Sequence, residues 1–125
     1  MVWDNPALFA DGGDALEGSF FSVLFSSETS DSAAVRFVEA YRVAFGISPD
    51  GAAAMGYDAM RLLGQAIRRA DTLEGAAIRD QIAATQDYRG ATKILRFDEN
   101  RHPIKSGAIL TIQNGEVRFH QQVEP

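Results

Sequence analysis

Cysteine is absent from this chain of 125 residues. Without thiols the protein can have no disulfide, no zinc–thiolate centre and no cysteine nucleophile. No apolar run is long enough to span a bilayer, and the chain does not open on the basic and then apolar segments of a signal peptide. A composition of 46% hydrophobic and 23% charged residues is typical of an ordinary globular protein with one core.

Positive charge is also scarce. Lysine and arginine number 12 against 17 acidic residues, which gives a net charge of −5 and a pI near 4.9. The cations are scattered along the chain rather than clustered, whereas binding to phosphate backbones needs clustered lysine and arginine. The sequence therefore argues against a nucleic-acid partner.

Motifs that mark catalytic or nucleotide-binding sites are missing as well. The chain has no GxSxG, P-loop, GxGxxG or HExxH pattern. His120 falls on the polar face of a predicted terminal strand, without a serine or cysteine partner nearby. We predict that the protein is not an enzyme, with no catalytic residue, no cofactor and no bound metal.

One polar cluster, FDENRHPIKSG at 97–107, raises the alternative of a metal or acid–base site. An EF-hand would need acidic residues at alternate positions, a central glycine and a distal glutamate, and this stretch lacks that pattern. Asp98, Asn100 and Pro103 are instead residues that tight turns prefer, and Arg101 would repel a cation. The cluster is interpreted as a turn between two strands.

Most of the chain before this cluster is predicted to be helical. A short helix over 5–10 is followed by a strand within 16–25, whose nearly continuous apolar run indicates burial on both faces in a parallel sheet. Helices are predicted over 33–45 and 52–70, and a third opens at the capping-box spacing of Asp71 and Glu74. The face of the 52–70 helix expected to be buried consists of Gly56, Met60, Leu63, Ile67 and Ala70, with Asp58 on the polar side.

The last third of the chain changes to the period of strands. Strands are predicted over 92–97, 108–112 and 116–120, and Asn114-Gly115 between the last two is a strong hairpin signal. Helices and strands alternate early and strands dominate the end, so the fold class is α/β.

The segments WDNPAL, RFVEAYRVAFGISPDGAAAMGYDAMRLLGQAIRRA and FDENRHPI follow one another in this order. In order and spacing they resemble the C-terminal third of branched-chain amino acid (Leu/Ile/Val-type) substrate-binding proteins of ABC transporters. The resemblance implies part of the type I periplasmic-binding-protein fold: three main helices, a buried strand and a C-terminal β-hairpin, divided between two lobes. It places 1–26 in the second lobe and 27–104 in the first, with 105–125 as a hinge strand and second-lobe hairpin.

The resemblance also implies where a small ligand binds. Trp3 and Asp4 would lie beside the ligand in the second lobe. Ala52 occupies a place where the family often has an aromatic side chain against the ligand, so the pocket is wider here or its wall comes from elsewhere. Tyr57 would pack at the start of its helix or line the cleft.

The resemblance implies an extracytoplasmic or periplasmic protein that hands an amino acid, or a related small carboxylate or amide, to the membrane permease of an ABC importer. A ligand-sensing module of a receptor or regulator, and a small stand-alone α/β enzyme, are the alternatives. The chain ends just after the predicted hairpin, which favours the transporter. Val38, Leu63, Ile67 and Ile82 would be left uncovered, so we expect association with the remaining N-terminal part of the protein or with a second copy, as a dimer with or without exchanged segments.

Overall fold

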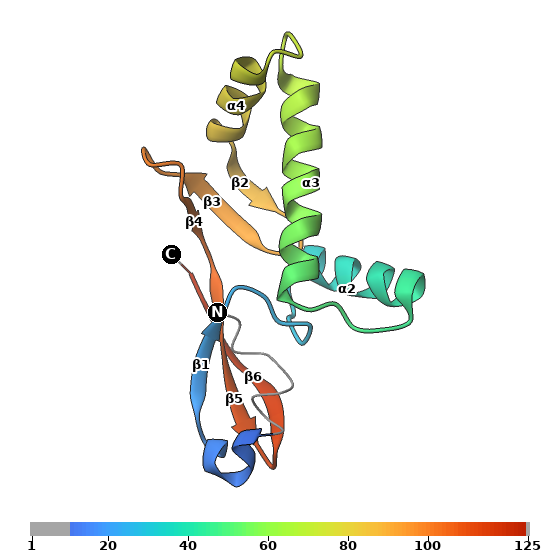
Figure 1. Ribbon diagram of the computed structural model, residues 1–125, viewed down its shortest axis with the longest axis vertical. Helices are drawn as coiled ribbons and strands as arrows, with labels where there is room; N and C mark the ends of the chain where they lie inside the picture. The colour runs from blue at the N-terminus through green and yellow to red at the C-terminus, as the bar shows by residue number, and fades with distance from the viewer. Residues whose placement is uncertain (1–10, 125) are drawn as a thin grey trace.

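The protein forms two small sheets with three helices, described in a computed structural model for residues 11–124 (Figure 1). The predicted helix over 5–10 lies outside the described residues. In chain order the elements are η1 (Gly13–Leu16), β1 (Phe20–Val23), α2 (Ser32–Phe45), α3 (Gly51–Arg69), α4 (Gly75–Ala83), β2 (Gln86–Arg89), β3 (Lys93–Phe97), β4 (Pro103–Lys105), β5 (Gly107–Gln113) and β6 (Glu116–Val123).

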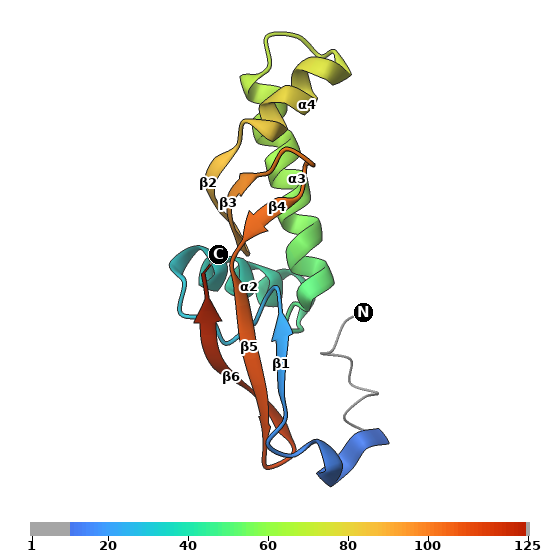
Figure 2. The same cartoon turned by 90° about the vertical axis from the view of Figure 1, so that its left-hand side faces the viewer.

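Each sheet has three antiparallel strands in the described part of the chain. Strands β1, β5 and β6 form one sheet in the order β1-β5-β6, called here the hairpin sheet. Strands β2, β3 and β4 form the other, called the helix-backed sheet because α3 runs alongside it (Figure 2). The two sheets follow one another along the long axis of the molecule, so β4 leads almost directly into β5.

The described chain passes between the two sheets twice. The first crossing, residues 24–31, leads from β1 to α2, and the second consists of Ser106 alone, between β4 and β5. The predicted segment boundaries, after 26 and after 104, lie beside these crossings. The assignment of the segments to two lobes stays a prediction.

Helix α2 is bounded by the local signals that its sequence contains. The Asp31 carboxylate accepts hydrogen bonds from the Ala33 amide at 3.0 Å and the Ala34 amide at 3.3 Å, as an N-cap does. Gly46 ends the helix with φ of 73°, in the left-handed region that glycine adopts at little cost. The predicted helix over 33–45 is confirmed.

Helix α3 forms where it was predicted, but it buries a different face. Its buried residues are Ala54, Asp58, Leu62 and Ala66, at a spacing of four. Met60, on the face predicted to be buried, is 68% exposed. The helix has two apolar stripes, and the sheet covers the one that carries Asp58. The prediction of Asp58 on a polar, solvent-facing side was wrong.

Strand β1 also differs from its prediction. It pairs antiparallel with β5 and is the edge strand of the hairpin sheet in the part of the chain that the structure describes. Its residue Phe20 is 61% exposed rather than buried. A continuous apolar run does not distinguish a strand enclosed on both faces from one whose second face remains open.

The start of α4 is a further local difference. Its N-cap is Glu74, whose side chain makes no capping bond, so the predicted capping box from Asp71 does not form. The Thr72 hydroxyl accepts a hydrogen bond from the Glu74 amide at 3.3 Å instead. The helix therefore begins at Gly75, three residues later than the Asp71–Glu74 spacing suggested.

The predicted hairpin turn is confirmed, and the turn predicted within 97–107 is confirmed only before Pro103, because Pro103–Lys105 form β4. Asn114 and Gly115 have φ of 54° and 71°, as a type I′ hairpin requires, and the Glu17 carboxylate accepts hydrogen bonds from both of their amides. In the β3–β4 connection, the Asp98 carboxylate accepts from the amides of Asn100 and His102 at 2.9 and 2.7 Å. The polar cluster thus uses its acidic side chain to hold the turn together.

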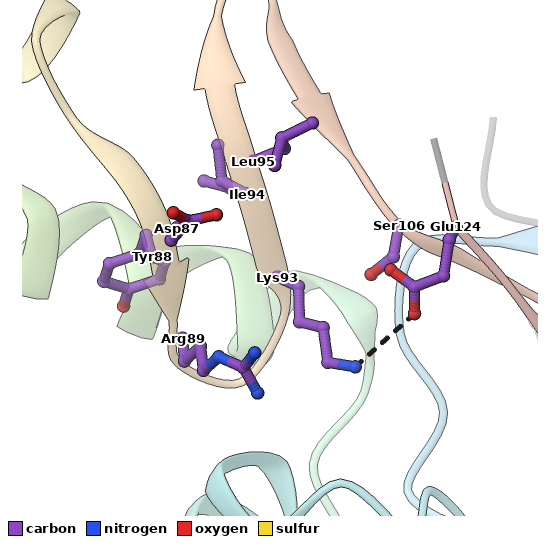
Figure 3. A pocket seen from close by; sticks show the side chains of 8 residues that line it. All are labelled: Asp87, Tyr88, Arg89, Lys93, Ile94, Leu95, Ser106 and Glu124. Atoms are coloured by element: carbon purple, nitrogen blue, oxygen red, sulfur yellow. Dashed lines mark hydrogen bonds and ion pairs between the residues drawn. The ribbon is translucent and has the colours of Figure 1, made fainter.

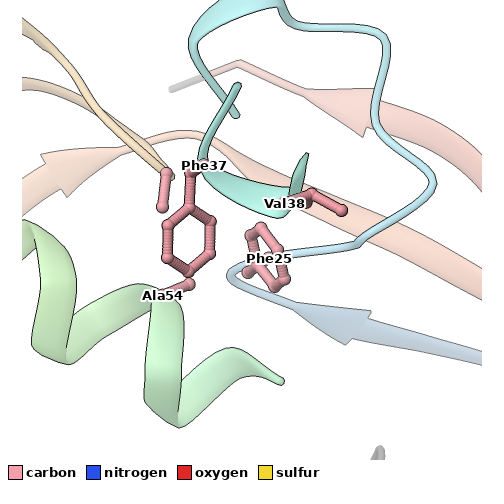
Figure 4. Close-up of a cluster of buried hydrophobic side chains, with 5 residues drawn as sticks. Phe25, Phe37, Val38 and Ala54 are labelled. Carbon is pink, nitrogen blue, oxygen red and sulfur yellow. The ribbon is translucent and has the colours of Figure 1, made fainter. Parts of the chain in front are cut away.

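The main core lies where the first crossing meets the helices (Figure 4). Phe25 from the crossing packs edge-on against Phe37 of α2, with ring centroids 5.8 Å apart. Val38 is 4% exposed, which contradicts its predicted place on an uncovered surface. Ala54 of α3 and Ala91 of the β2–β3 turn complete the cluster. No helix within the described residues is long and apolar enough to cross a membrane.

Candidate functional site

A groove of about 190 Å³ opens where α3 begins, facing the hairpin sheet. Three separate segments form it: residues 25–28 of the first crossing, Pro49–Gly51 at the start of α3, and side chains of β5 and β6. We call it the α3 groove. Its apolar wall consists of Phe25, Pro49, Leu110, Val117 and Phe119. An apolar wall with a few polar groups at its rim is the usual character of a small-ligand site.

The start of α3 places both backbone amides and the Asp50 carboxylate at one side of the groove. The first backbone amides of a helix lack intrahelical acceptors, and the aligned peptide dipoles add to their charge. The Asp50 carboxylate accepts a hydrogen bond from the Ala53 amide at 2.7 Å, which satisfies one of these donors. Gly51 and Ala52 follow Asp50 and present little side-chain bulk.

Glu28 provides negative charge at the same groove. Its carboxylate accepts a hydrogen bond from the Phe119 amide of β6 at 2.9 Å and lies 3.7 Å from the Arg118 guanidinium. The Ser26 hydroxyl in turn accepts from the Glu28 amide at 3.2 Å. These contacts hold the first crossing against the hairpin sheet and place a carboxylate beside the apolar wall.

The two predicted ligand-binding residues that the structure describes lie apart. Ala52 is exposed in the first turn of α3, next to Gly51 of the groove lining. Tyr57 stacks on Phe37 of α2 with ring centroids 4.7 Å apart, and its hydroxyl accepts a hydrogen bond from Arg61 at 2.9 Å. Trp3 and Asp4 lie outside the described residues. The ligand contacts of all four remain predictions.

A larger pocket, of about 410 Å³, lies on β2 and β3 beside the second crossing (Figure 3). Two of its charged residues, Lys93 and Glu124, form an ion pair at 3.4 Å. Its apolar residues are Tyr88, Ile94 and Leu95, and it lacks a helix start. The α3 groove is therefore the better candidate for the ligand site, although it is the smaller of the two.

A family profile described as "Periplasmic binding protein" matches residues 2–116. The chain belongs to the periplasmic binding protein family. The profile match covers most of the sequence, so the family is assigned for the chain as a whole and not for one motif. The fold and family are those of non-catalytic substrate-binding proteins.

Solved structures of periplasmic binding proteins match the same architecture. A leucine-binding protein of Thermotoga maritima is 36% identical with a TM-score of 0.83, over 98% of this chain and 35% of its own. The branched-chain amino acid transporter substrate-binding protein of Streptococcus pneumoniae, solved in complex with isoleucine, is 28% identical with a TM-score of 0.75, over 93% of this chain and 34% of its own. The chain thus spans about a third of the length of these relatives and has part of the type I fold, as predicted. No curated protein sequence matches it.

One buried group of this periplasmic binding protein was missed by the sequence analysis. Asp58 is 3% exposed, and its carboxylate accepts four hydrogen bonds. The donors are the Tyr88 hydroxyl at 2.9 Å, the Ala91 amide at 2.8 Å, the Thr92 amide at 2.8 Å and the Thr92 hydroxyl at 2.6 Å. Asp58 therefore fastens α3 to the turn between β2 and β3.

Little free space surrounds the Asp58 carboxylate. A Cβ on Gly90 would come within 2.0 Å of the Asp58 carboxylate, so this turn position has room for glycine only. Burial, together with the hydrogen bond to the carboxylate, raises the pKa of Tyr88 above its ordinary value. The one sequence signal for this group was the spacing of four that joins Asp58 to Ala54, Leu62 and Ala66.

Proposed function

We propose that the chain is part of an extracytoplasmic substrate-binding protein that takes up an amino acid, or a related small carboxylate or amide, for an ABC importer. The observation that supports this proposal best is the α3 groove, which occurs in a chain of the periplasmic binding protein family. Its solved relatives include a leucine-binding protein at 36% identity and a protein solved with isoleucine at 28%. The membrane permease and the extracytoplasmic location belong to the same proposal.

The charges of the α3 groove suit a zwitterion. The backbone amides at the start of α3 can donate to a carboxylate or carbonyl oxygen, and the Glu28 and Asp50 carboxylates favour an ammonium group. The apolar wall of the groove can take an aliphatic side chain. At Ala52 the chain has a methyl group only, which leaves room for a branched or longer side chain.

We propose that the whole ligand site is larger than the α3 groove. A pocket for a small ligand usually measures about 300–1,000 Å³, and the α3 groove measures about 190 Å³. Trp3 and Asp4 are proposed to supply part of the remaining wall. The rest comes from segments that the matched relatives have and this chain does not span.

Ala52→Phe tests the proposed site. In the protein expressed from its complete reading frame, we expect the affinity for leucine and isoleucine to fall by about tenfold or more, because an aromatic ring would occupy the space left for the side chain. Isothermal titration calorimetry measures the change. Ala52→Ser, which keeps the side chain small, is the matched control and should stay within about twofold of the parent. Equal affinities for all three proteins would contradict the placement of the ligand at α3.

The predicted association with the rest of the protein, or with a second copy, also stays a proposal. The second apolar stripe of α3 supports it, with Met60 68% and Ile67 38% exposed. Leu63 lies on the same stripe and is half-buried. Apolar surface of this kind loses about 25 cal/mol of stabilisation for each Å² left in water.

A further inference from the structure

Lys93 contacts every segment that links the two sheets in the described part of the chain. It is the first residue of β3, in the helix-backed sheet. Its ammonium lies 3.4 Å from the Asp31 carboxylate, where the first crossing ends, and 3.4 Å from the Glu124 carboxylate, which follows β6 of the hairpin sheet. Its backbone carbonyl accepts a hydrogen bond from the amide of Ser106, the second crossing, at 3.2 Å.

The site around Lys93 is partly shielded from solvent, which strengthens its ion pairs. The side chains of Lys93 and Asp31 are 32% and 21% exposed, and that of Glu124 is 61% exposed. Ser106 is 4% exposed. Burial alone would raise the pKa of Asp31, but hydrogen bonds from the amides of Ala34 and Ala33 and the charge of Lys93 outweigh it and lower the pKa. Asp31 is therefore held in its charged form beside Lys93.

The side chain of Lys93 adds a second set of contacts to a junction that Glu28 and Phe25 of the first crossing also hold. The second crossing is a single residue, so rotation there involves few backbone bonds. A narrow cavity of about 30 Å³, lined by Asp31, Lys93, Ser106 and Gln122 among others, lies within the junction. In Figure 3 the Lys93 side chain reaches across the open pocket to Glu124.

We propose that Lys93 sets the angle between the two sheets. Its ion pairs with Asp31 and Glu124 act as electrostatic ties that join the helix-backed sheet to the first crossing and to the end of β6. The tie to Asp31 holds the first crossing and the start of α2, and the tie to Glu124 holds the hairpin sheet. Loss of either tie widens the range of angles without unfolding either sheet. The inference concerns the junction alone and does not depend on which ligand the α3 groove binds.

The absence of cysteine makes the angle measurable with introduced labels. Arg96 of β3 and Gln121 of β6 are exposed and lie on different sheets. The double variant R96C/Q121C, spin-labelled in the protein expressed from its complete reading frame, reports the distance between the sheets by pulsed electron paramagnetic resonance. All measurements are made without added ligand, so a failure of the proposed function does not affect them.

Lys93→Met should broaden the distance distribution and shift its populations by about threefold to fivefold, the size expected for partly exposed ion pairs. Lys93→Arg should retain the parent distribution. Asp31→Asn keeps the helix cap and loses the charge. Glu124→Gln loses only the ion pair to the hairpin sheet. Each variant should therefore broaden the distance distribution less than Lys93→Met does. Identical distributions for Lys93→Met and Lys93→Arg would overturn the proposal.

A salt titration of the parent protein gives a second measurement that needs no change at the junction. At ~1 M salt the Debye length is about 3 Å, and partly exposed pairs are screened. The proposal predicts broadening in the parent on going from low to high salt, and no such change in Lys93→Met. A parent distribution that does not respond to salt would contradict the electrostatic tie, even if Lys93→Met failed to fold.

Discussion

Replacing Asp58 with alanine is expected to lower the free energy of unfolding by about 3–5 kcal/mol, because four buried donors lose their acceptor at once. Two of these donors are backbone amides of the β2–β3 turn, from Ala91 and Thr92, which are 4% and 6% exposed. Urea unfolding followed by circular dichroism measures the loss. The affected contact is the one between α3 and the helix-backed sheet.

The matched control for this prediction is Asp80→Ala. Asp80 lies on α4, is 65% exposed, and pairs only with Arg79. Removal of an exposed pair of this kind changes stability by about 0–1 kcal/mol. Tyr88→Phe removes one donor and leaves three, so its cost should be about 1 kcal/mol. If Asp58→Ala cost no more than Asp80→Ala, the network would have no role in holding α3 in place.

Phe37→Ala is the second large effect, with an expected loss of about 3–5 kcal/mol. Phe37 is 5% exposed, and its ring contacts those of Phe25, Tyr41 and Tyr57. The substitution opens a cavity where the first crossing, α2 and α3 meet (Figure 4). Differential scanning calorimetry would show the loss as a lower midpoint of unfolding.

Val43→Ala on the same helix gives the comparison for Phe37. Val43 is 89% exposed, so its truncation should change stability by no more than about 0.5 kcal/mol. A similar shift for both variants would mean that the cluster around Phe37 is not the main core. Because Phe25 belongs to the first crossing, Phe37→Ala should also loosen the α3 groove.

Local signals predicted most of the secondary structure. Asp31 and Gly46 bound α2, and Asn114-Gly115 forms the hairpin, because in each case the residues that decide the conformation are adjacent in the chain. Strand β2 was not predicted: its residues Gln86–Arg89 are mostly polar, and only Tyr88 is buried. Pairing with β3 determines this strand, and a single segment does not reveal its partner.

The buried face of α3 could not be predicted from periodicity. Its stripe through Met60 and Ile67 is more hydrophobic than the stripe through Asp58, yet the latter is buried. The Asp58 carboxylate can be buried because the amides of Ala91 and Thr92, thirty-three and thirty-four residues further along the chain, donate hydrogen bonds to it. Such a match between distant segments is fixed by tertiary structure.

The candidate site was predicted in part. The resemblance to the family pointed to the start of α3 through Ala52, and the structure places a groove beside that residue. Phe25, Glu28 and Phe119 were not foreseen, because they come together only when the first crossing folds against β6. Trp3 and Asp4 lie beyond the described residues, so their predicted part in the site is untested.

The proposed function implies that the parts on either side of the α3 groove close around a bound ligand, and small-angle X-ray scattering tests this most directly. The protein expressed from its complete reading frame is measured alone and with saturating leucine, isoleucine or valine, with binding verified by calorimetry. Hinge closure brings the parts on either side of the groove together, so the radius of gyration should fall when ligand binds. Binding of any of the three amino acids with an unchanged radius of gyration would contradict the account.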